Sequence, residues 1–175
     1  MMSLFAILSA LLDYPTTELQ GALGEIRLRT ETANDLEDAE RQAILALLAT
    51  LEECSIVELQ SRYVEIFDLN PDHSLHLTHH LLGDDNRERG PALIQLASHF
   101  CQQGWEIHNG ELPDFLPLLL EFAAQLPLQD AESFLAEAVP ALAILAGNLE
   151  RHGHPAHAAL VRLVERRGRR ALATA

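Results

Sequence analysis

Four histidines lie within a short segment near the middle of the chain, and imidazole nitrogen is a frequent ligand of transition metals. They are His73, His76, His79 and His80. If this segment is helical, His76 and His80 lie one turn apart on the same face, as two ligands of one metal would. Carboxylates that could supply a third ligand follow closely, and these are Asp72, Asp84 and Asp85.

The rest of the sequence lacks the motifs that metal enzymes use. No Cys-x-x-Cys, His-Glu-x-x-His or Glu-x-x-His pattern occurs, so neither a zinc protease nor a di-iron bundle is indicated. A metal-binding helical protein that uses the His73–His80 cluster is therefore kept as the alternative hypothesis. The simpler interpretation is a set of solvated or hydrogen-bonded imidazoles, and we expect no bound metal.

Residue patterns for catalysis are also missing. Cys54 and Cys101 each lie inside an apolar helical pattern, which favours two buried, unreactive thiols over a nucleophile. The chain has no glycine-rich phosphate loop, no Gly-x-Ser-x-Gly motif and no dinucleotide fingerprint. We therefore expect a protein that is not an enzyme and carries no cofactor of its own.

A polar loop offers a third kind of chemistry, the recognition of a partner. Gly83 is suited to end a helix in a left-handed conformation, and a turn then leads into a helix near Pro91. The loop would present charged residues at the rim of a helical body, namely Asp84, Asp85, Arg87, Glu88 and Arg89. The alternative is a solvated surface turn without a binding role.

Charge is distributed unevenly along the chain. There is no lysine; residues 1–150 carry a net charge of −19, and residues 151–175 carry +5. Such an acidic body repels nucleic acid and anionic membranes, and it attracts a cationic partner. The basic run Arg166–Arg170 could be a binding patch, but a solvated helix end is the more ordinary interpretation, since arginine complements the helix dipole there.

Hydropathy gives no sign of a membrane segment. No apolar run reaches the roughly 18 residues that a membrane-spanning helix needs. The apolar start of the chain has no basic region and no small-residue cleavage site, so it is typical of a first helix rather than of a signal peptide. We expect a cytoplasmic protein with reduced thiols.

Helical periodicity covers nearly the whole chain, and no β-hairpin signal or internal repeat occurs. Clear helical runs span residues 3–13, 91–103 and 155–167. In the second of these, the apolar side chains that we expect to face the core are Leu93, Ile94, Leu96, Ala97 and Phe100. The fold class predicted is a single all-α domain over residues 1–175, with about eight or nine helices. Residues 151–175 form its last helix and an arginine-rich tail.

Capping signals place several of the other helix starts. Thr16 is suited to cap a second helix, and Asn34 with Glu37, then Ser55 with Glu58, have the spacing of capping boxes.

Three more residues set helix limits later in the chain. Asp114 is suited to cap a helix that has Pro117 in its first turn, and Asp130 to begin the next one. Pro140 should kink or break that next helix, because an interior proline costs about 3 kcal/mol.

Two blocks of sequence resemble the NarJ family of nitrate reductase assembly chaperones, which is related to TorD and DmsD. The first block contains Tyr63–Asp68, Ser74–Thr78, His80–Gly83 and Arg87–Gly90. The second contains Glu111–Leu118, Glu121 and Gln125–Pro127, and the segment Leu11–Pro15 matches as well. The family pattern usually has a second histidine at the position of Leu82, and here Arg87 lies one residue further along. The resemblance covers about residues 5–150.

The resemblance implies an all-helical chaperone without catalysis. Such a protein binds the N-terminal leader-like segment of the catalytic subunit of a nitrate reductase, or of a related molybdoenzyme, in the cytoplasm. It supports insertion of the molybdenum cofactor into that client before membrane docking. The acidic body fits this implication, because a leader-like segment is typically basic and amphipathic, and an amphipathic helix binds in an apolar groove.

The expected peptide-binding site is an apolar and aromatic groove near Tyr63 and Phe67. The polar residues expected at or near its edge are Glu65, Asp68, His80, Asp84, Asp85, Arg87 and Arg89. Asp68 and Arg89 could instead pair with each other and fix the loop.

Overall fold

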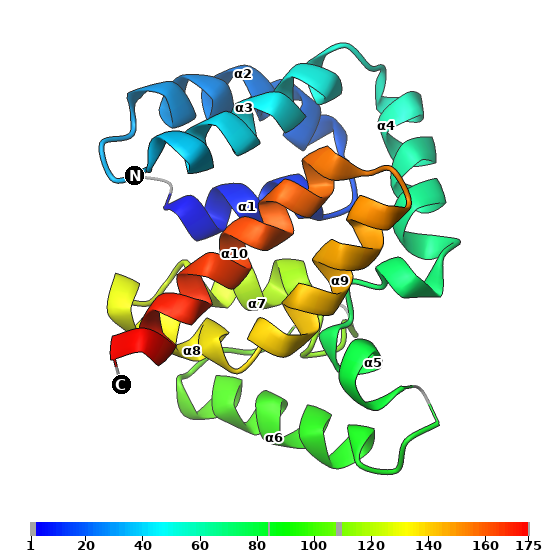
Figure 1. The fold of residues 1–175 in the computed structure, drawn as a ribbon, viewed down its shortest axis with the longest axis vertical. Coiled ribbons are helices and arrows are strands. Elements are labelled where there is room, and N and C mark those ends of the chain that lie inside the picture. Colours follow the sequence, from blue (N-terminus) through cyan, green and yellow to red (C-terminus); the bar gives the residue numbers. More distant parts are fainter. Residues whose placement is uncertain (1–2, 84, 108–109, 175) are drawn as a thin grey trace.

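The computed structural model describes residues 3–83, 85–107 and 110–174, and it confirms the predicted all-α fold (Figure 1). Within these ranges the chain forms ten α-helices, one or two more than expected, and no β-strand. A short π-helix, η1 (Val64–Asp68), and a 3-10 turn, η2 (Pro71–His73), separate α4 from α5. The helices are α1 (Leu4–Leu12), α2 (Thr17–Thr32), α3 (Asp38–Glu52), α4 (Ile56–Tyr63), α5 (Leu77–Leu82), α6 (Arg89–Gln102), α7 (Leu116–Ala123), α8 (Leu128–Ala136), α9 (Val139–Arg151) and α10 (Pro155–Thr174).

Helix α10 runs across the body and packs on α8, α9 and α3, as Figure 1 shows. Leucines from several helices meet in one fully buried core, for example Leu8, Leu120, Leu142 and Leu160. Gly168 lies where α10 packs closely on α8, because a Cβ atom there would lie 2.9 Å from the carbonyl oxygen of Leu135. A side chain at this position would therefore force the two helices apart.

Two predicted helix caps are confirmed. Thr16 Oγ1 accepts a hydrogen bond from the Leu19 N–H at 3.2 Å, and α2 begins at the next residue. Ser55 and Glu58 form the expected capping box, in which the Glu58 carboxylate accepts from the Ser55 N–H at 2.8 Å. Local side-chain-to-backbone spacing was sufficient to predict both starts.

The predicted cap of α3 is wrong by one turn. The helix begins at Asp38, and the capping box joins Glu37 to Glu40 rather than Asn34 to Glu37. Glu37 and Glu40 have the same three-residue spacing as Asn34 and Glu37, although glutamate is not a usual N-cap residue. The Glu37–Glu40 box prevails in a structure where the Glu40 side chain is also held by Arg167.

The predicted limits of α7 and α8 need correction. Asp114 does not cap α7, which begins at Leu116 after Phe115; its carboxylate instead accepts from the Thr78 N–H of α5 at 3.1 Å. Pro117 does lie in the first turn of α7, as expected. Helix α8 begins at Leu128, two residues before Asp130.

Pro140 separates α8 from α9, as the sequence indicated. Helix α8 ends at Ala136, and α9 begins at Val139 with the proline in its first turn, where a missing N–H costs nothing. The last helix, α10, begins at Pro155 as predicted but continues to Thr174, beyond the expected end at Arg167.

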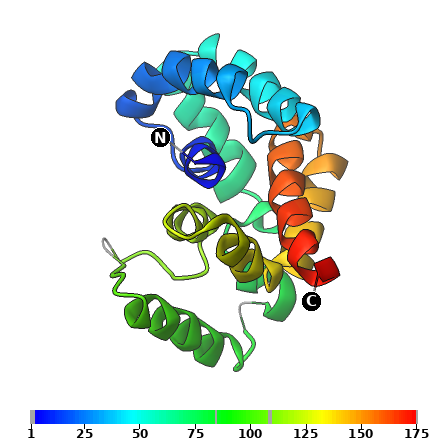
Figure 2. The same cartoon turned by 90° about the vertical axis from the view of Figure 1, so that its left-hand side faces the viewer.

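Helix α6 lies at one edge of the molecule, with α7 between it and α1 (Figure 2). The prediction that its apolar stripe faces the core holds only in part, because Leu96 packs against the core while partly buried, Leu93 and Ala97 are also only partly buried, and Ile94 is exposed. Only Phe100 is buried, and Ile94 is 68% exposed. Cys101, which was expected to be buried, is exposed on the same helix, whereas Cys54 is buried as expected.

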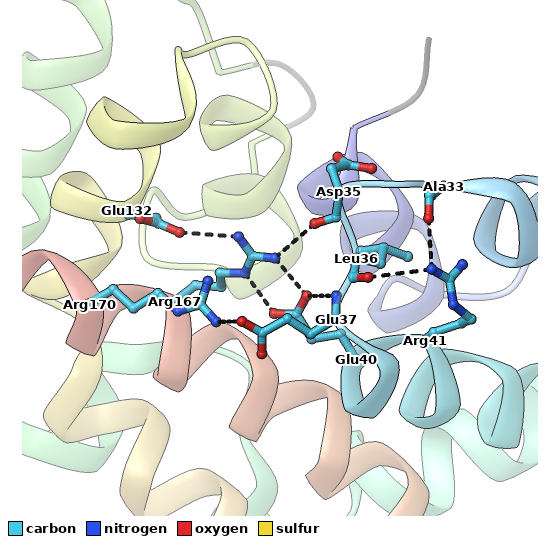
Figure 3. Close-up of polar contacts among 9 residues, drawn as sticks. All are labelled: Ala33, Asp35, Leu36, Glu37, Glu40, Arg41, Glu132, Arg167 and Arg170. Carbon is cyan, nitrogen blue, oxygen red and sulfur yellow. Dashed lines mark hydrogen bonds and ion pairs between the residues drawn. The ribbon is translucent and has the colours of Figure 1, made fainter.

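The arginine-rich end of α10 is solvated only in part, because Arg166 and Arg169 are exposed but Arg167 is buried. Arg167 is only 4% exposed, and its guanidinium donates to both carboxylate oxygens of Glu40 at 2.6 and 2.7 Å (Figure 3). Glu132 of α8 lies 3.3 Å away on its other side, and Arg170 pairs with Glu37. These contacts fasten the end of α10 to α3 and α8.

Within the described ranges, no single helix is both long and apolar enough to cross a membrane. Helices α8 and α9 satisfy that test only when taken together, and they are bent by 76° at the break between them.

Candidate functional site

Two cavities lie on either side of the C-terminal end of α1, and Asp13 lines both of them. The larger, about 660 Å³, is called the acidic cavity here. The smaller, about 430 Å³, is called the apolar pocket. The two cavities are thus neighbours that share Asp13 as a lining residue.

The acidic cavity gathers carboxylates from three parts of the chain. Its walls come from α1, from α7 and from the segment that follows α6. The lining residues are Ser9, Asp13, Gly104, Trp105, Glu106, Glu111, Phe115, Pro117, Leu118 and Glu121. Acidic side chains are therefore placed beside two aromatic rings, which is the surface that a basic, amphipathic ligand would contact.

Packing holds the walls of the acidic cavity in place. The Ser9 hydroxyl donates to the carbonyl oxygen of Pro117 at 2.8 Å, which joins α1 to α7. Trp105 packs edge-on against Phe100 and Phe122, with ring centroids 5.6 and 5.5 Å away. Since Phe100 and Phe122 belong to the core, the indole is a fixed part of the wall.

Among the described residues, positively charged side chains balance the negative charges of the acidic cavity at most in part. Asp13 is exposed as a residue, but partial desolvation of its carboxylate raises its pKa above the usual value, while the Tyr14 N–H lowers the pKa and nearby Glu111 raises it further. Glu111 accepts a hydrogen bond from His76 Nε2 at 3.1 Å. In the described part of the chain, no arginine lies within ion-pair distance of any of the four carboxylates of the cavity, which are Asp13, Glu106, Glu111 and Glu121. The cavity is thus ready to accept a cationic group.

The apolar pocket lies between the end of α4 and the turn that joins α9 to α10. Leucines of α1, α2, α3 and α4 line its interior, including Leu11, Leu23 and Leu59. Its other lining residues come from two further segments, with Arg62, Tyr63 and Glu65 in one and Gly153, His154, Pro155, Ala156 and His157 in the other.

An aromatic cluster supports one wall of the apolar pocket. Tyr63 contacts Tyr14 and Phe67, with ring centroids 5.3 and 5.0 Å apart, and Phe67 meets His157 at 5.5 Å. Burial, together with the negative charge of Asp13, raises the pKa of Tyr63 above its usual value. Tyr63 therefore stays neutral and presents a ring, not a charge, to the pocket.

The structure separates the predicted site residues into two groups. Tyr63 and Glu65 line the apolar pocket, and Phe67 is buried behind Tyr63. Asp68 is exposed and lines neither cavity. The other group belongs to α5, α6 and the loop between them.

The loop group lies away from both cavities. Asp85 and Arg87 are exposed, and Asp84 lies outside the described residues. His80 donates to the Ser74 carbonyl at 2.7 Å; burial lowers the pKa of its ring, although this hydrogen bond opposes the shift. Neither cavity includes these side chains among its lining residues.

Arg89 has a structural task instead of the suggested pairing with Asp68. Its Nε donates to Thr78 Oγ1 at 2.9 Å, and its guanidinium lies 3.9 Å from the buried carboxylate of Asp114. The ion pairs among the described residues include none between Arg89 and Asp68. Arg89 and Asp114 thus join the start of α6 to α5 and to the residues before α7.

The described residues give no support to the alternative hypothesis of a metal site in the His73–His80 cluster, and Asp84, one of its candidate ligands, lies outside them. His76 has an extended backbone and precedes α5, so it does not lie one helical turn from His80. Its ring contacts Glu111, whereas the His80 ring contacts Ser74. In the described ranges, no three His, Cys, Asp or Glu side chains are placed to hold a metal ion.

Sequence reasoning missed the residues of the acidic cavity. Asp13, Glu111 and Glu121 all lie inside the blocks on which the family resemblance was based, so their presence there was the available signal. Trp105 lies outside those blocks. It joins the site only because the segment after α6 folds back against α7.

Comparison with known proteins adds independent information. A family profile described as "Nitrate reductase delta subunit" matches residues 33–155. The nitrate reductase molybdenum cofactor assembly chaperone NarJ of Escherichia coli K12 is 34% identical over 145 residues, which cover 83% of this chain and 61% of that protein.

Two further relatives give similar matches. The probable nitrate reductase molybdenum cofactor assembly chaperone NarJ of Bacillus subtilis 168 is 31% identical over 148 residues, which are 85% of this chain and 79% of that protein. The probable chaperone NarW of Escherichia coli K12 is 28% identical over 171 residues, 95% and 69% of the two chains. The chain thus spans about three fifths of the Escherichia coli NarJ relative.

Proposed function

The chain belongs to the nitrate reductase delta subunit family, the NarJ family, and from this premise we propose that it is an assembly chaperone for a molybdoenzyme of the nitrate reductase type. It binds the basic N-terminal segment of the apo catalytic subunit in the cytoplasm. It releases that client after the molybdenum cofactor has been inserted. The cofactor is cargo of the client, and the chaperone itself performs no catalysis.

The observation that carries this proposal is the meeting of an apolar pocket and a carboxylate-lined cavity at Asp13. A basic segment that folds as an amphipathic helix has one apolar face and one cationic face. The apolar pocket can take side chains from the first face, while the acidic cavity attracts arginine or lysine from the second. Each part of the ligand thus has a matching part of the surface.

The two parts contribute differently to binding. Apolar burial at Tyr63 and the leucines supplies most of the affinity, because it removes hydrocarbon from water. The carboxylates of the acidic cavity orient the segment and accelerate its association. The exposed Asp85 of the loop acts at a greater distance and attracts the basic segment, whereas the positive charge of Arg87 beside it does not contribute to this attraction.

The test is calorimetry with a synthetic peptide that has the N-terminal sequence of a nitrate reductase catalytic subunit. Binding to the wild-type chain should weaken partly at high salt, since screening limits the reach of the field to about 8 Å at physiological ionic strength. The double variant Asp13→Asn/Glu121→Gln should bind about tenfold more weakly.

The matched control is Asp85→Asn/Glu88→Gln, which removes two negative charges from the exposed loop. It should mainly slow association and leave the dissociation rate unchanged, as is typical of rim charges. Equal weakening by both double variants would remove the acidic cavity from the proposal, and a peptide that binds neither wild type nor variants would overturn it.

A further inference from the structure

His76 joins the two sequence blocks on which the family resemblance was based. It comes just before α5, and its backbone pairs with that of Phe115, just before α7, in an isolated antiparallel bridge. Beside this bridge the Leu77 N–H donates to the carbonyl oxygen of Asp114 at 3.0 Å, and on its other side the Leu116 N–H donates across the pairing at 2.8 Å. The backbone therefore holds the segment before α7 against the start of α5 without help from the imidazole.

The imidazole of His76 contacts two residues that line the acidic cavity. Its Nε2 lies 3.1 Å from Oε1 of Glu111, and since an ionised carboxylate only accepts, Nε2 carries the proton and donates it. Its ring lies beside that of Phe115, with centroids 5.2 Å apart and 32° between the ring planes. Glu111 and Phe115 both line the cavity, whereas His76 is not among the lining residues. The imidazole thus reaches the cavity through these two side chains.

The chain holds Glu111 by one of its two carboxylate oxygens. Besides the His76 bond, Oε1 accepts a hydrogen bond from the Leu112 N–H at 3.0 Å, and the hydrogen bonds between described residues include none to Oε2. Asp13 has a similar arrangement, because its Oδ1 accepts from the Tyr14 N–H at 2.7 Å and its Oδ2 has no donor in the described ranges. Each carboxylate therefore has one oxygen fixed by the chain and one left for a ligand.

The charges of Asp13 and Glu111 repel each other. Partial desolvation raises the pKa of Asp13, and although the Tyr14 N–H lowers it, the negative charge of Glu111 raises it further. Such repulsion favours a Glu111 side chain that turns away into water, and this side chain is 39% exposed. The hydrogen bond from His76 opposes that movement and keeps the second negative charge at the cavity.

We infer that His76 is a positioning residue of the acidic cavity, whose imidazole holds the Glu111 carboxylate and the Phe115 ring in place for a cationic side chain of the ligand. A carboxylate that is already fixed loses less conformational freedom when the cation arrives, so the same contact gives tighter binding. An aromatic ring adds attraction for a cation placed over its face. The effect on the two side chains belongs to the free chain, whereas its consequence for peptide binding rests on the proposed function.

A purely structural role for His76 leads to a different expectation. Its side chain is 31% exposed, and the backbone bridge does not need the ring. His76→Ala should therefore leave the amides of Leu77 and Leu116 protected from hydrogen exchange, as in the wild type. Loss of that protection would mean that the ring holds the whole segment, and the positioning role would be wrong.

Three variants separate the contacts of the imidazole. His76→Ala removes both the donor and the ring, whereas in His76→Gln the side-chain Nε2 can still donate to Glu111. The matched control is His79→Ala, which removes an imidazole from α5 that lines neither cavity. Measurements at pH 8, above the ordinary titration range of histidine, ensure that the substitutions change contacts and not charge.

The first readout needs no peptide, because the single tryptophan of the chain, Trp105, lines the acidic cavity. Its fluorescence is quenched with the N-methylpyridinium cation and with neutral acrylamide at low salt. The ratio of the two quenching constants corrects for access and reports the attraction of the cavity for a cation. His76→Ala and Glu111→Gln should each lower this ratio about twofold, while His76→Gln and His79→Ala should match the wild type.

The second readout is calorimetry with the N-terminal peptide of a nitrate reductase catalytic subunit. His76→Ala should bind it about fivefold more weakly, the effect of one hydrogen bond, and His76→Gln should restore most of the affinity. In a Glu111→Gln background, His76→Ala should cause a smaller further loss, because the two side chains act together. Equal losses in both backgrounds, or no rescue by His76→Gln, would overturn the positioning role.

The two readouts distinguish failure of this inference from failure of the proposed function. If the quenching ratio responds as described but the peptide binds neither wild type nor variants, His76 positions the carboxylate and the proposed function fails. If the peptide binds the wild type while His76→Ala changes neither the ratio nor the affinity, the proposed function stands and the positioning role fails.

Discussion

Two regions of this molecule gather acidic side chains, and they differ in whether arginine balances the negative charge. At the junction of α10 with α3 and α8, the buried carboxylate of Glu40 receives two hydrogen bonds from Arg167, and Glu132 lies on the other side of the same guanidinium. Around the end of α1, the carboxylates of Asp13 and Glu121 line an open cavity. The first region balances its charges within the chain, whereas the carboxylates of the second have no arginine partner among the described residues.

The pKa directions express the same difference. Burial alone would raise the pKa of Glu40, but hydrogen bonds from Arg167 and the Glu37 N–H outweigh it, so that the pKa lies below its usual value. At Asp13 burial prevails and the pKa is raised. A closed ion pair thus stabilises the charge on Glu40, while the charge on Asp13 in the acidic cavity is unfavourable.

The largest effect should come from breaking the closed region. Arg167→Met leaves the buried Glu40 without its cation, and we expect a loss of about 3–5 kcal/mol in the free energy of unfolding. Urea unfolding measures it. The double variant Arg167→Met/Glu40→Gln removes the stranded charge and keeps the capping hydrogen bond to Glu37, so it should be more stable than the single variant. A loss below about 1 kcal/mol in the single variant would mean that the pair is not a structural fastening.

The Arg167–Glu40 ion pair also shows which kind of contact the sequence alone does not predict. The cap at Ser55 and Glu58 depends on residues three apart, and it was predictable from spacing alone. Arg167 meets Glu40 across most of the chain, so its interpretation as a solvated helix end was wrong. Local patterns contain no information about which distant carboxylate faces a given arginine.

The candidate site, like the fold, was predictable from the sequence only in part. Tyr63 and Glu65 were proposed from the family resemblance, and both line the apolar pocket. Asp114 was expected to cap its own helix, but it accepts from Thr78 of α5 instead. The apolar stripe of α6 predicted a buried helix, yet Ile94 is exposed. Periodicity indicates which face of a helix is apolar, and the tertiary arrangement decides what covers that face.

A second prediction separates structure from binding on the open face. Phe67 is buried behind Tyr63, so Phe67→Ala should reduce the free energy of unfolding by about 3 kcal/mol. Tyr63→Ala, which replaces a half-buried residue that lines the pocket, should cost clearly less stability but weaken peptide binding. Melting curves together with calorimetry distinguish the two. Weak binding by a fully stable Phe67→Ala would instead assign Phe67 to the peptide contact.

The third prediction concerns the charge that the open face tolerates. A carboxyl group with a raised folded-state pKa binds protons more tightly in the folded chain, so stability falls as pH rises from the unfolded-state value of 3.8 through the folded value. Asp13→Asn removes this cost and should raise the midpoint of thermal unfolding at pH 7 by less than about 3 °C. The gain over the wild type should vanish below about pH 3.8. A variant that is less stable at pH 7 would contradict the unfavourable charge inferred for the site.

The smallest effect should come from the outer ion pair of the closed region. Arg170 lies about one helical turn after Arg167 and pairs with Glu37. The side chains of Arg170 and Glu37 are 40% and 59% exposed, so water screens their attraction. Arg170→Gln should therefore cost about 0.5 kcal/mol or less, and added salt should reduce even that loss. Urea unfolding beside Arg167→Met compares two arginines of the same helix end. If Arg170→Gln were as damaging as Arg167→Met, burial would not be what distinguishes them. A double-variant cycle would then be expected to show strong coupling, with the two arginines acting as one unit.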